Sequence, residues 1–154
     1  MSISERARAK TKLCDHCPAK AVRSLPQHRR LFGLIRAAHM HWPEAHDFQP
    51  LSEEHLRKWL LAKAGHHTVK TMTLSDMTSG EAIALLEAAF HAAGAYSFVK
   101  GTAGKVHIFT PKSIAFEKLH HKAACLLFDE IGAVIELELG IKADDLLRQT
   151  EAAA

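Results

Sequence analysis

The stretch LHHKAACLLFDEIGAVIELELG, residues 119–140, decides the fold. Its apolar side chains recur every three or four residues, which is the spacing of one face of an α-helix. They are Ala124, Leu127, Phe128, Ile131, Val134, Ile135 and Leu139. A continuous apolar face of this length predicts a long helix that is largely buried.

The segment before this helix, YSFVKGTAGKVHIFTP at residues 96–111, predicts a β-hairpin. Its β-branched and aromatic residues favour strands over 96–100 and 105–110, with a turn at 101–104. We do not expect this turn to bind phosphate, because a strand rather than a helix follows it. After the long helix, ADDLLRQ predicts a short last helix, and the tail TEAAA is expected to fray.

The N-terminal half contains two more predicted helices. Ser24 and Gln27 match a capping box with a proline in the first turn, and Pro43 ends the helix, which predicts a helix over 25–41. Ser52 is followed by two glutamates, which the helix dipole favours in a first turn, and Gly65 ends that second helix.

One strand and one helix complete the pattern. HTVKTMTL, residues 67–74, alternates in the manner of a strand. Thr78 and Glu81 then form another capping box, which predicts a helix that reaches about residue 93 and stops at Gly94. Because helices alternate with few strands, two of which form a local hairpin, we predict an α+β fold: a helix-rich single domain with a small antiparallel sheet.

Size and composition limit the function classes. The 154 residues fit one domain, predicted over 22–150 and preceded by a basic segment, 1–21, that contains a C-x-x-C motif. No signal sequence and no long apolar run is present, and three cysteines are too few and odd in number for a disulfide framework. We therefore expect a cytoplasmic protein that does not contact membranes.

Charge is unevenly distributed along the chain. Residues 1–70 hold 13 Lys and Arg against 6 Asp and Glu, a balance of +7, and residues 71–154 hold 7 against 11, a balance of −4. A basic half indicates either a surface that binds a polyanion or two halves of the chain that attract each other. Twelve histidines would add positive charge on acidification, so polyanion binding should strengthen below about pH 6.5.

The helix predicted over 25–41 has an apolar face and a basic one. Its core stripe comprises Leu31, Leu34, Ile35, Ala38 and Trp42. Arg29 and Arg36 lie opposite this stripe with Gly33, and Arg30 and His28 lie on its flanks. We expect Phe32 and Trp59 to lie near core stripes, where packing is favoured over stacking on bases.

The sequence leaves a metal site open. Cys14 and Cys17 have a spacing that lets two thiolates share one zinc ion, but no second pair of ligands completes the set. His39 and His41 point about 160° apart on a helix, so they do not share an ion there. A small zinc module, a redox pair and two free thiols all remain interpretations of Cys14 and Cys17. No nucleophile-elbow, phosphate-loop, zinc-protease or dinucleotide motif occurs, so enzymatic activity is uncertain and not expected.

Two segments carry a family pattern. The first runs Arg23, Ser24, Gln27, His28, Arg29, Arg30, Leu31 and Phe32, and the second runs Pro111, Lys112, Ser113, Ile114, Ala115 and Phe116 before the long helix. Together they resemble a phage and prophage family related in pattern to the NinB/Orf recombination proteins. That resemblance implies a dimer that binds single-stranded DNA and engages the host single-strand-binding protein. The matched polar residues that would face a phosphate backbone are Arg23, His28, Arg29, Arg30 and Lys112.

Our leading hypothesis from the sequence is therefore a phage-derived accessory protein of DNA recombination or replication. It would act as a homodimer and bind single-stranded DNA through its basic helix, with Arg36 added to the matched residues. Two alternatives remain open: a protein-interaction module that captures or inhibits a host protein, and the zinc module on Cys14 and Cys17.

Overall fold

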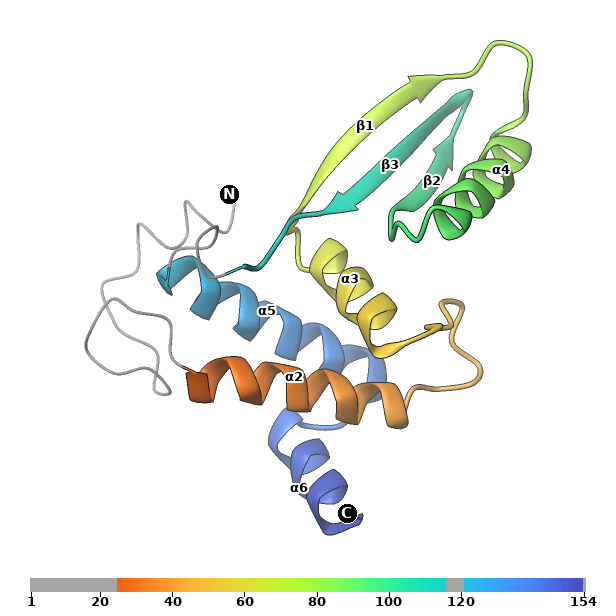
Figure 1. Ribbon diagram of the computed structural model, residues 1–154. Helices are drawn as coiled ribbons and strands as arrows, with labels where there is room; N and C mark the ends of the chain where they lie inside the picture. Colours follow the sequence, from red (N-terminus) through yellow and green to blue (C-terminus); the bar gives the residue numbers. More distant parts are fainter. Residues whose placement is uncertain (1–24, 116–120, 154) are drawn as a thin grey trace.

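A computed structural model describes residues 25–115 and 121–153 of the chain (Figure 1). The elements follow the order α2 (Leu25–Met40), α3 (Glu53–Lys63), β1 (His67–Thr73), α4 (Ser79–Ala92), β2 (Phe98–Thr102), β3 (Lys105–Pro111), α5 (His121–Leu139) and α6 (Ala143–Ala153). Four helices, α2, α3, α5 and α6, gather in one part of the molecule, and the three strands with α4 form the other. The predicted α+β fold is confirmed.

The helical part is built around α5. Its apolar face is buried as expected, with Leu127, Ile131 and Ile135 fully enclosed against α2 and α3. The stripe on α2 supplies the other side of this core, and Ala37 joins it with no exposed surface. Burying one face of this 19-residue helix removes a continuous row of apolar side chains from water, which stabilises the domain.

The sheet part is a three-stranded antiparallel sheet in the order β1-β3-β2. Val99, Val106 and Ile108 point to the side on which α4 packs, where they meet Ala82 in a second, smaller core. The opposite side of the sheet has no helix alongside it in Figure 1; the other helices gather at the lower end of the strands.

Two of the three predicted caps are confirmed, and the third, at Ser24, lies outside the described residues. Ser52 accepts a hydrogen bond from the backbone N–H of His55 at 3.1 Å, and Thr78 with Glu81 forms the reciprocal capping box. Gly65 and Gly94 adopt positive φ where α3 and α4 stop.

Four details of the structure differ from the sequence-based expectation, and the first two are the hairpin turn and the C-terminal tail. The hairpin turn is tighter than residues 101–104, because Thr102 pairs with Lys105, and Gly101 belongs to strand β2. A Cβ at Gly101 would lie 2.8 Å from the Cβ of Ser79, so glycine is needed there for α4 to approach the sheet. The C-terminal tail does not fray through 150–153, because α6 continues to Ala153.

The other two differences lie on α2. Gly33 does not face solvent fully, because α6 packs beside it and the nearest atom to a Cβ there would be Cδ2 of Leu147 at 3.7 Å. Phe32 is 38% exposed rather than packed in the core, and it contacts the ring of His28 and the guanidinium of Arg57. Trp59, by contrast, is buried as expected.

Candidate nucleic-acid interface

The basic face predicted on α2 is partly neutralised by acidic side chains. Arg36 donates to Glu53 at the start of α3 (3.2 Å), and Arg30 forms an ion pair with Asp144 at the start of α6. Arg29 is exposed and pairs with no acid among the described residues. Arg30 lies in the basic half of the chain and Asp144 in the acidic half, so this ion pair fits the interpretation that the two halves attract each other.

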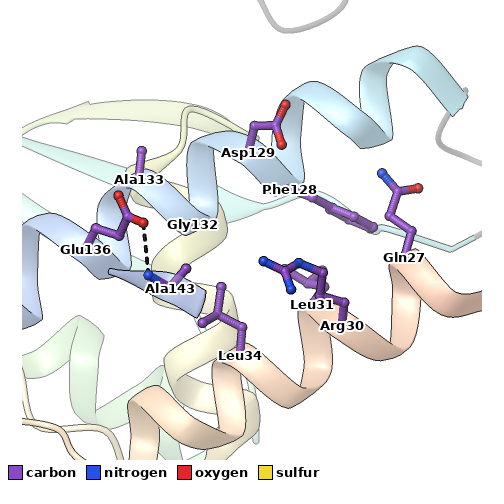
Figure 2. Close-up of a pocket in the computed structure, with 10 residues that line it drawn as sticks. All are labelled: Gln27, Arg30, Leu31, Leu34, Phe128, Asp129, Gly132, Ala133, Glu136 and Ala143. Carbon is purple, nitrogen blue, oxygen red and sulfur yellow. Dashed lines mark hydrogen bonds between the residues drawn. The ribbon is translucent and has the colours of Figure 1, made fainter. Parts of the chain in front are cut away.

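A cavity of about 230 Å³ lies beside Arg30, between α2, α5 and the start of α6 (Figure 2). Its charged lining consists of Arg30 from α2 with Asp129 and Glu136 from α5. Glu136 also accepts a hydrogen bond from the backbone N–H of Ala143 at 2.9 Å, which holds the first turn of α6. Two carboxylates beside one paired arginine repel phosphate, so this cavity does not favour an anionic ligand.

The remaining predicted site residues lie elsewhere. Lys112 is exposed just after β3, and its backbone N–H donates to the carbonyl oxygen of His66 at 3.0 Å. It therefore belongs to the end of the sheet rather than to α2. Arg23, Cys14 and Cys17 lie outside the described residues, so the zinc site stays a prediction.

The side of the sheet opposite α4 carries a different group of side chains. The register places Thr71 opposite His107, Lys100 opposite His107 on the other strand, and Thr102 opposite Lys105. Lys105 and His107 alternate with the buried Val106 and Ile108 along β3, so they and the residues paired with them on β1 and β2 share the uncovered side. We call this surface the open sheet face; its members are Val69, Thr71, Thr73, Phe98, Lys100, Thr102, Lys105, His107 and Phe109.

The open sheet face is basic and has no acidic counterpart. Lys100 and Lys105 are exposed, and neither forms an ion pair with a residue that the structure describes. The three strand segments contain no Asp or Glu, and Lys70 on the other side of β1 adds a further exposed cation. Unpaired lysines on a surface without carboxylates create a positive potential that attracts a polyanion.

Hydrogen bonds fix the centre of this surface. The imidazole of His107 lies between two hydroxyls, with Nδ1 2.9 Å from Oγ1 of Thr71 and Nε2 3.0 Å from Oγ1 of Thr102. One polar bridge therefore crosses all three strands and holds the ring on the sheet. At the lower end of the same face, Phe98 and Phe109 are directly opposed and only partly buried.

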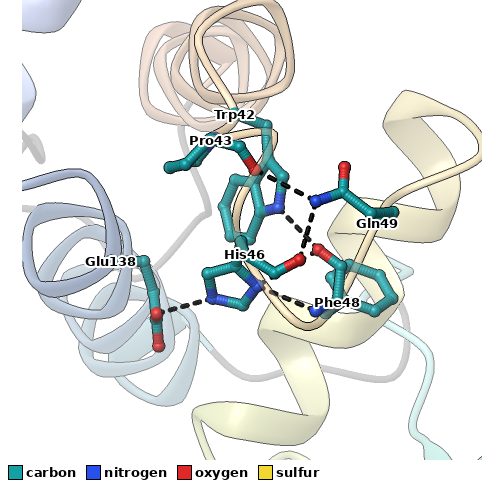
Figure 3. Close-up of polar contacts among 6 residues, drawn as sticks. All are labelled: Trp42, Pro43, His46, Phe48, Gln49 and Glu138. Carbon is teal, nitrogen blue, oxygen red and sulfur yellow. Dashed lines mark hydrogen bonds and ion pairs between the residues drawn. The ribbon is translucent and has the colours of Figure 1, made fainter.

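A histidine–glutamate pair elsewhere in the molecule is structural. Figure 3 shows His46 between Glu138 of α5 and the loop after α2. Nδ1 of His46 accepts from the amide N–H of Phe48 (2.9 Å) and lies 3.1 Å from the carbonyl oxygen of the same residue, while Nε2 lies 2.8 Å from a carboxylate oxygen of Glu138. Both ring nitrogens therefore have partners within the protein, and the side chain joins the loop after α2 to α5.

The same loop is held by two further side chains. Trp42 donates from Nε1 to the carbonyl oxygen of Phe48 at 2.8 Å, and Gln49 donates to backbone carbonyls of residues 43, 44 and 46 (Figure 3). These contacts satisfy backbone groups in a segment that has no regular structure. The cluster thus fixes the connection from α2 to α3.

Two histidines near the junction of the two parts have shifted pKa values. Burial lowers the pKa of His55, and the charge of His91 lowers it further. Burial also lowers the pKa of His66, with a smaller opposing effect from its hydrogen bond to the carbonyl of Ser113. Both shifts favour the neutral imidazole, so these two residues do not add to a cationic surface at neutral pH.

No family model, no curated protein and no solved structure matches the chain. A function for this protein therefore has to be argued from the geometry of its surfaces. Within residues 25–115 and 121–153, no three side chains of His, Cys, Asp or Glu are placed to share a metal ion. None of the described helices is both long and apolar enough to cross a membrane.

Sequence reasoning placed the basic surface on α2 and missed the open sheet face. A signal was present, since residues 96–115 contain three lysines and no acidic residue. That signal becomes visible only with the strand register, which puts Lys100 and Lys105 on one side of the sheet.

Proposed function

We propose that this protein binds single-stranded nucleic acid, and single-stranded DNA in particular, on the open sheet face. The observation that supports this most is the combination of Lys100 and Lys105, unpaired with any described acid, on a sheet side that α3 contacts only near Phe98. Lysines bind phosphate oxygens without regard to sequence and release counterions from the strand.

The form of the surface favours a single strand over a duplex. A sheet offers an almost flat platform on which the bases of an unpaired strand can spread, whereas a helix or a ribbon is needed to enter the major groove of a duplex. Phe109 lies on this face and leaves part of its ring accessible for contact with a base. The exposed hydroxyl of Thr73, opposite Lys105, adds a hydrogen-bond donor for phosphate.

Helix α2 takes a secondary part in this proposal. Arg29 can meet the strand directly, but Arg36 and Arg30 would first have to leave Glu53 and Asp144. An arginine that exchanges one carboxylate for one phosphate gains less than an unpaired lysine does. Lys112 extends the basic surface from the end of β3 and, among the matched polar residues that the structure describes, is the one that adjoins the sheet.

The wider role that we propose follows the family resemblance: an accessory protein of phage-derived recombination or replication in a bacterial cytoplasm. A homodimer would present two open sheet faces to one strand, and the host single-strand-binding protein would be a further partner. The sheet surface supports the nucleic-acid part of this role.

The test is a pair of double variants that remove equal charge from the two surfaces. In fluorescence anisotropy with a labelled single-stranded oligonucleotide at low salt, Lys100→Ala/Lys105→Ala should weaken binding by roughly tenfold or more. Arg29→Ala/Arg36→Ala serves as the matched control and should weaken binding less. A larger loss in the arginine variant would move the site to α2, and absence of any salt-dependent binding would refute the proposal.

Salt dependence gives an independent measure of the same contacts. Each phosphate contact made to a single strand contributes about 0.7 to the slope of log affinity against log salt concentration. The lysine double variant should therefore reduce the magnitude of that slope by about 1.4, and by a similar amount for strands of different sequence. An unchanged slope would show that neither lysine contacts the backbone.

A further inference from the structure

A second cavity, of about 320 Å³, lies where the helical part and the sheet part meet. It is bounded by the loop before α3, the start of α3, the end of α4 and the residues leading into β2. We call it the aromatic cleft; its lining comprises Asp47, Phe48, Gln49, Leu51, His55, Glu87, Phe90, His91, Ala95, Tyr96, Ser97 and Phe98.

Four rings form a connected wall in this cleft. His55 stacks on Tyr96 with centroids 5.0 Å apart and lies parallel to Phe98 at 5.8 Å. Phe48 meets His55 edge-on at 4.9 Å and is itself stacked on the buried Trp59 at 4.8 Å. The wall is thus fixed from behind by the core, and its rings are not free to rotate away from the cavity.

The imidazole in this wall is held uncharged. The backbone N–H of Leu51 donates to Nδ1 of His55 at 3.1 Å, which occupies that lone pair. Burial and the neighbouring His91 both act in the same direction and lower the pKa of His55. The wall therefore presents ring surfaces and no buried positive charge at neutral pH.

The charged groups that line the aromatic cleft are two acids and no lysine or arginine. Asp47 lies on the loop before α3 and Glu87 on α4, and both side chains are exposed. Neither forms an ion pair or a hydrogen bond through its carboxylate with a described residue. Two unpaired carboxylates approach one aromatic wall from different elements.

Rings and carboxylates together select a class of ligand. The face of an aromatic ring carries negative electrostatic potential and attracts cations that are weakly hydrated. The two carboxylates repel phosphate and add attraction for positive charge. A neutral apolar ligand would use the rings but gain nothing from the acids.

We propose that the aromatic cleft binds an organic cation, a quaternary ammonium or guanidinium group, either on a small molecule or on the side chain of a partner protein. This site shares Phe98 with the lower end of the open sheet face, but it includes neither Lys100 nor Lys105 and does not depend on nucleic-acid binding. The basic sheet and the acidic cleft would then take ligands of opposite charge.

The experiment compares a cation with its neutral isostere. Choline and 3,3-dimethyl-1-butanol differ by a quaternary nitrogen in place of a carbon, and their binding to the full chain can be followed by chemical-shift changes in NMR titration. We expect choline to bind at least tenfold more tightly and to perturb Tyr96 and Phe98 signals. Equal affinity for the two compounds, or no binding of choline, would overturn the proposal.

Variants locate the site and separate it from the sheet. Asp47→Asn/Glu87→Gln keeps the shape of the cleft and should weaken choline binding by about tenfold. Glu44→Gln, an exposed acid of the same loop outside the cleft, is the matched control and should have no effect. An equal loss in Glu44→Gln would mean that general surface charge, and not this cleft, attracts the cation.

Two further measurements separate the two proposals and identify the source of the cation. Lys100→Ala/Lys105→Ala should leave choline binding unchanged, and Asp47→Asn/Glu87→Gln should not weaken binding of single-stranded DNA, so either proposal can fail without the other. Titration with a peptide that carries trimethyl-lysine or arginine identifies the source of the cation: tighter binding than choline indicates a protein side chain, and weaker binding indicates a small molecule.

Discussion

The basic side chains of the helical part and those of the sheet part differ in whether they pair with acids. On α2, Arg30 and Arg36 reach acids on other helices, and their charges help to join elements. On the sheet, Lys100 and Lys105 meet no acid among the described residues. The apolar cores differ as well, since α5 is buried among three helices whereas one helix covers one side of the sheet. A count of charges along the sequence does not distinguish a charge used in folding from one left for a ligand.

The largest expected effect tests the difference between the two cores. Ile131→Ala, at a fully buried position on α5, should lower the free energy of unfolding by about 4 kcal/mol. Ile108→Ala in the smaller core should cost about 2 kcal/mol, because the sheet lies nearer to solvent and can relax more easily. Urea unfolding measures both, and an equal or larger loss at Ile108 would contradict the comparison.

The next effect concerns the contact between α4 and the sheet. Gly101→Ala places a Cβ 2.8 Å from Ser79 and 3.0 Å from Ile83, so α4 must shift, at a cost of about 1–3 kcal/mol. Gly80→Ala is the matched control, since it lies in the first turn of α4 with open space around it. That control should be neutral or slightly stabilising in thermal unfolding, and a stable Gly101→Ala would mean that α4 lies less tightly on the sheet than the structure shows.

A smaller effect depends on pH and on the boundary between the two parts. The folded state holds the pKa of His55 below its ordinary value of about 6.5, so folding favours the neutral ring. Its contribution to stability is complete above about pH 6.5 and is lost as the pH falls from there through the folded pKa. His55→Phe keeps the ring and should show a smaller drop in melting temperature between pH 7.5 and 5.5.

The pKa of His66 is also lowered in the folded state. The His55→Phe variant should therefore still lose some melting temperature between pH 7.5 and 5.5. His41→Phe, at an exposed position, is the control and should keep the full pH dependence of the parent. A variant at His55 with unchanged pH dependence would show that its protonation does not differ between folded and unfolded states.

The smallest effect concerns the ion pairs that distinguish α2. Arg36 and Glu53 are both substantially exposed, at 67% and 48%, so their pairing is screened by water and contributes about 0–1 kcal/mol. Arg36→Ala should therefore change the unfolding midpoint very little. The informative measurement is DNA affinity: if Glu53→Gln increases it, Arg36 is released to the strand and α2 shares the function of the sheet.

Local signals predicted the fold well because they act over a few residues. The capping residues Ser52 and Thr78 and the terminal glycines set helix ends to within a residue or two. The spacing of apolar residues on α5 identified the buried helix. The turn was placed less well, because the choice of Gly101 reflects the nearby α4, which local sequence cannot show.

The candidate sites were less predictable because they depend on contacts between distant residues. The partner of Arg30 is 114 residues away at Asp144, and nothing near either residue indicates the pair. The aromatic cleft joins Phe48, His55 and Tyr96 from three segments, none of which has a motif of its own. Sequence periodicity gives the face of an element but not what lies opposite it.

The hydrogen bond between Lys112 and His66 has a consequence for how the chain is assembled. The chain leaves the helical part after His66 and returns at Lys112, and these two residues are bonded to each other at 3.0 Å. The segment from β1 to β3 is therefore an insertion whose two ends meet at one place, and it also contacts the helical part through Tyr96 and Phe98, which pack on His55. A short linker in its place would keep the end of α3 beside the path to α5 and would remove α4 and the sheet together, at the cost of uncovering His55 where Tyr96 and Phe98 now pack.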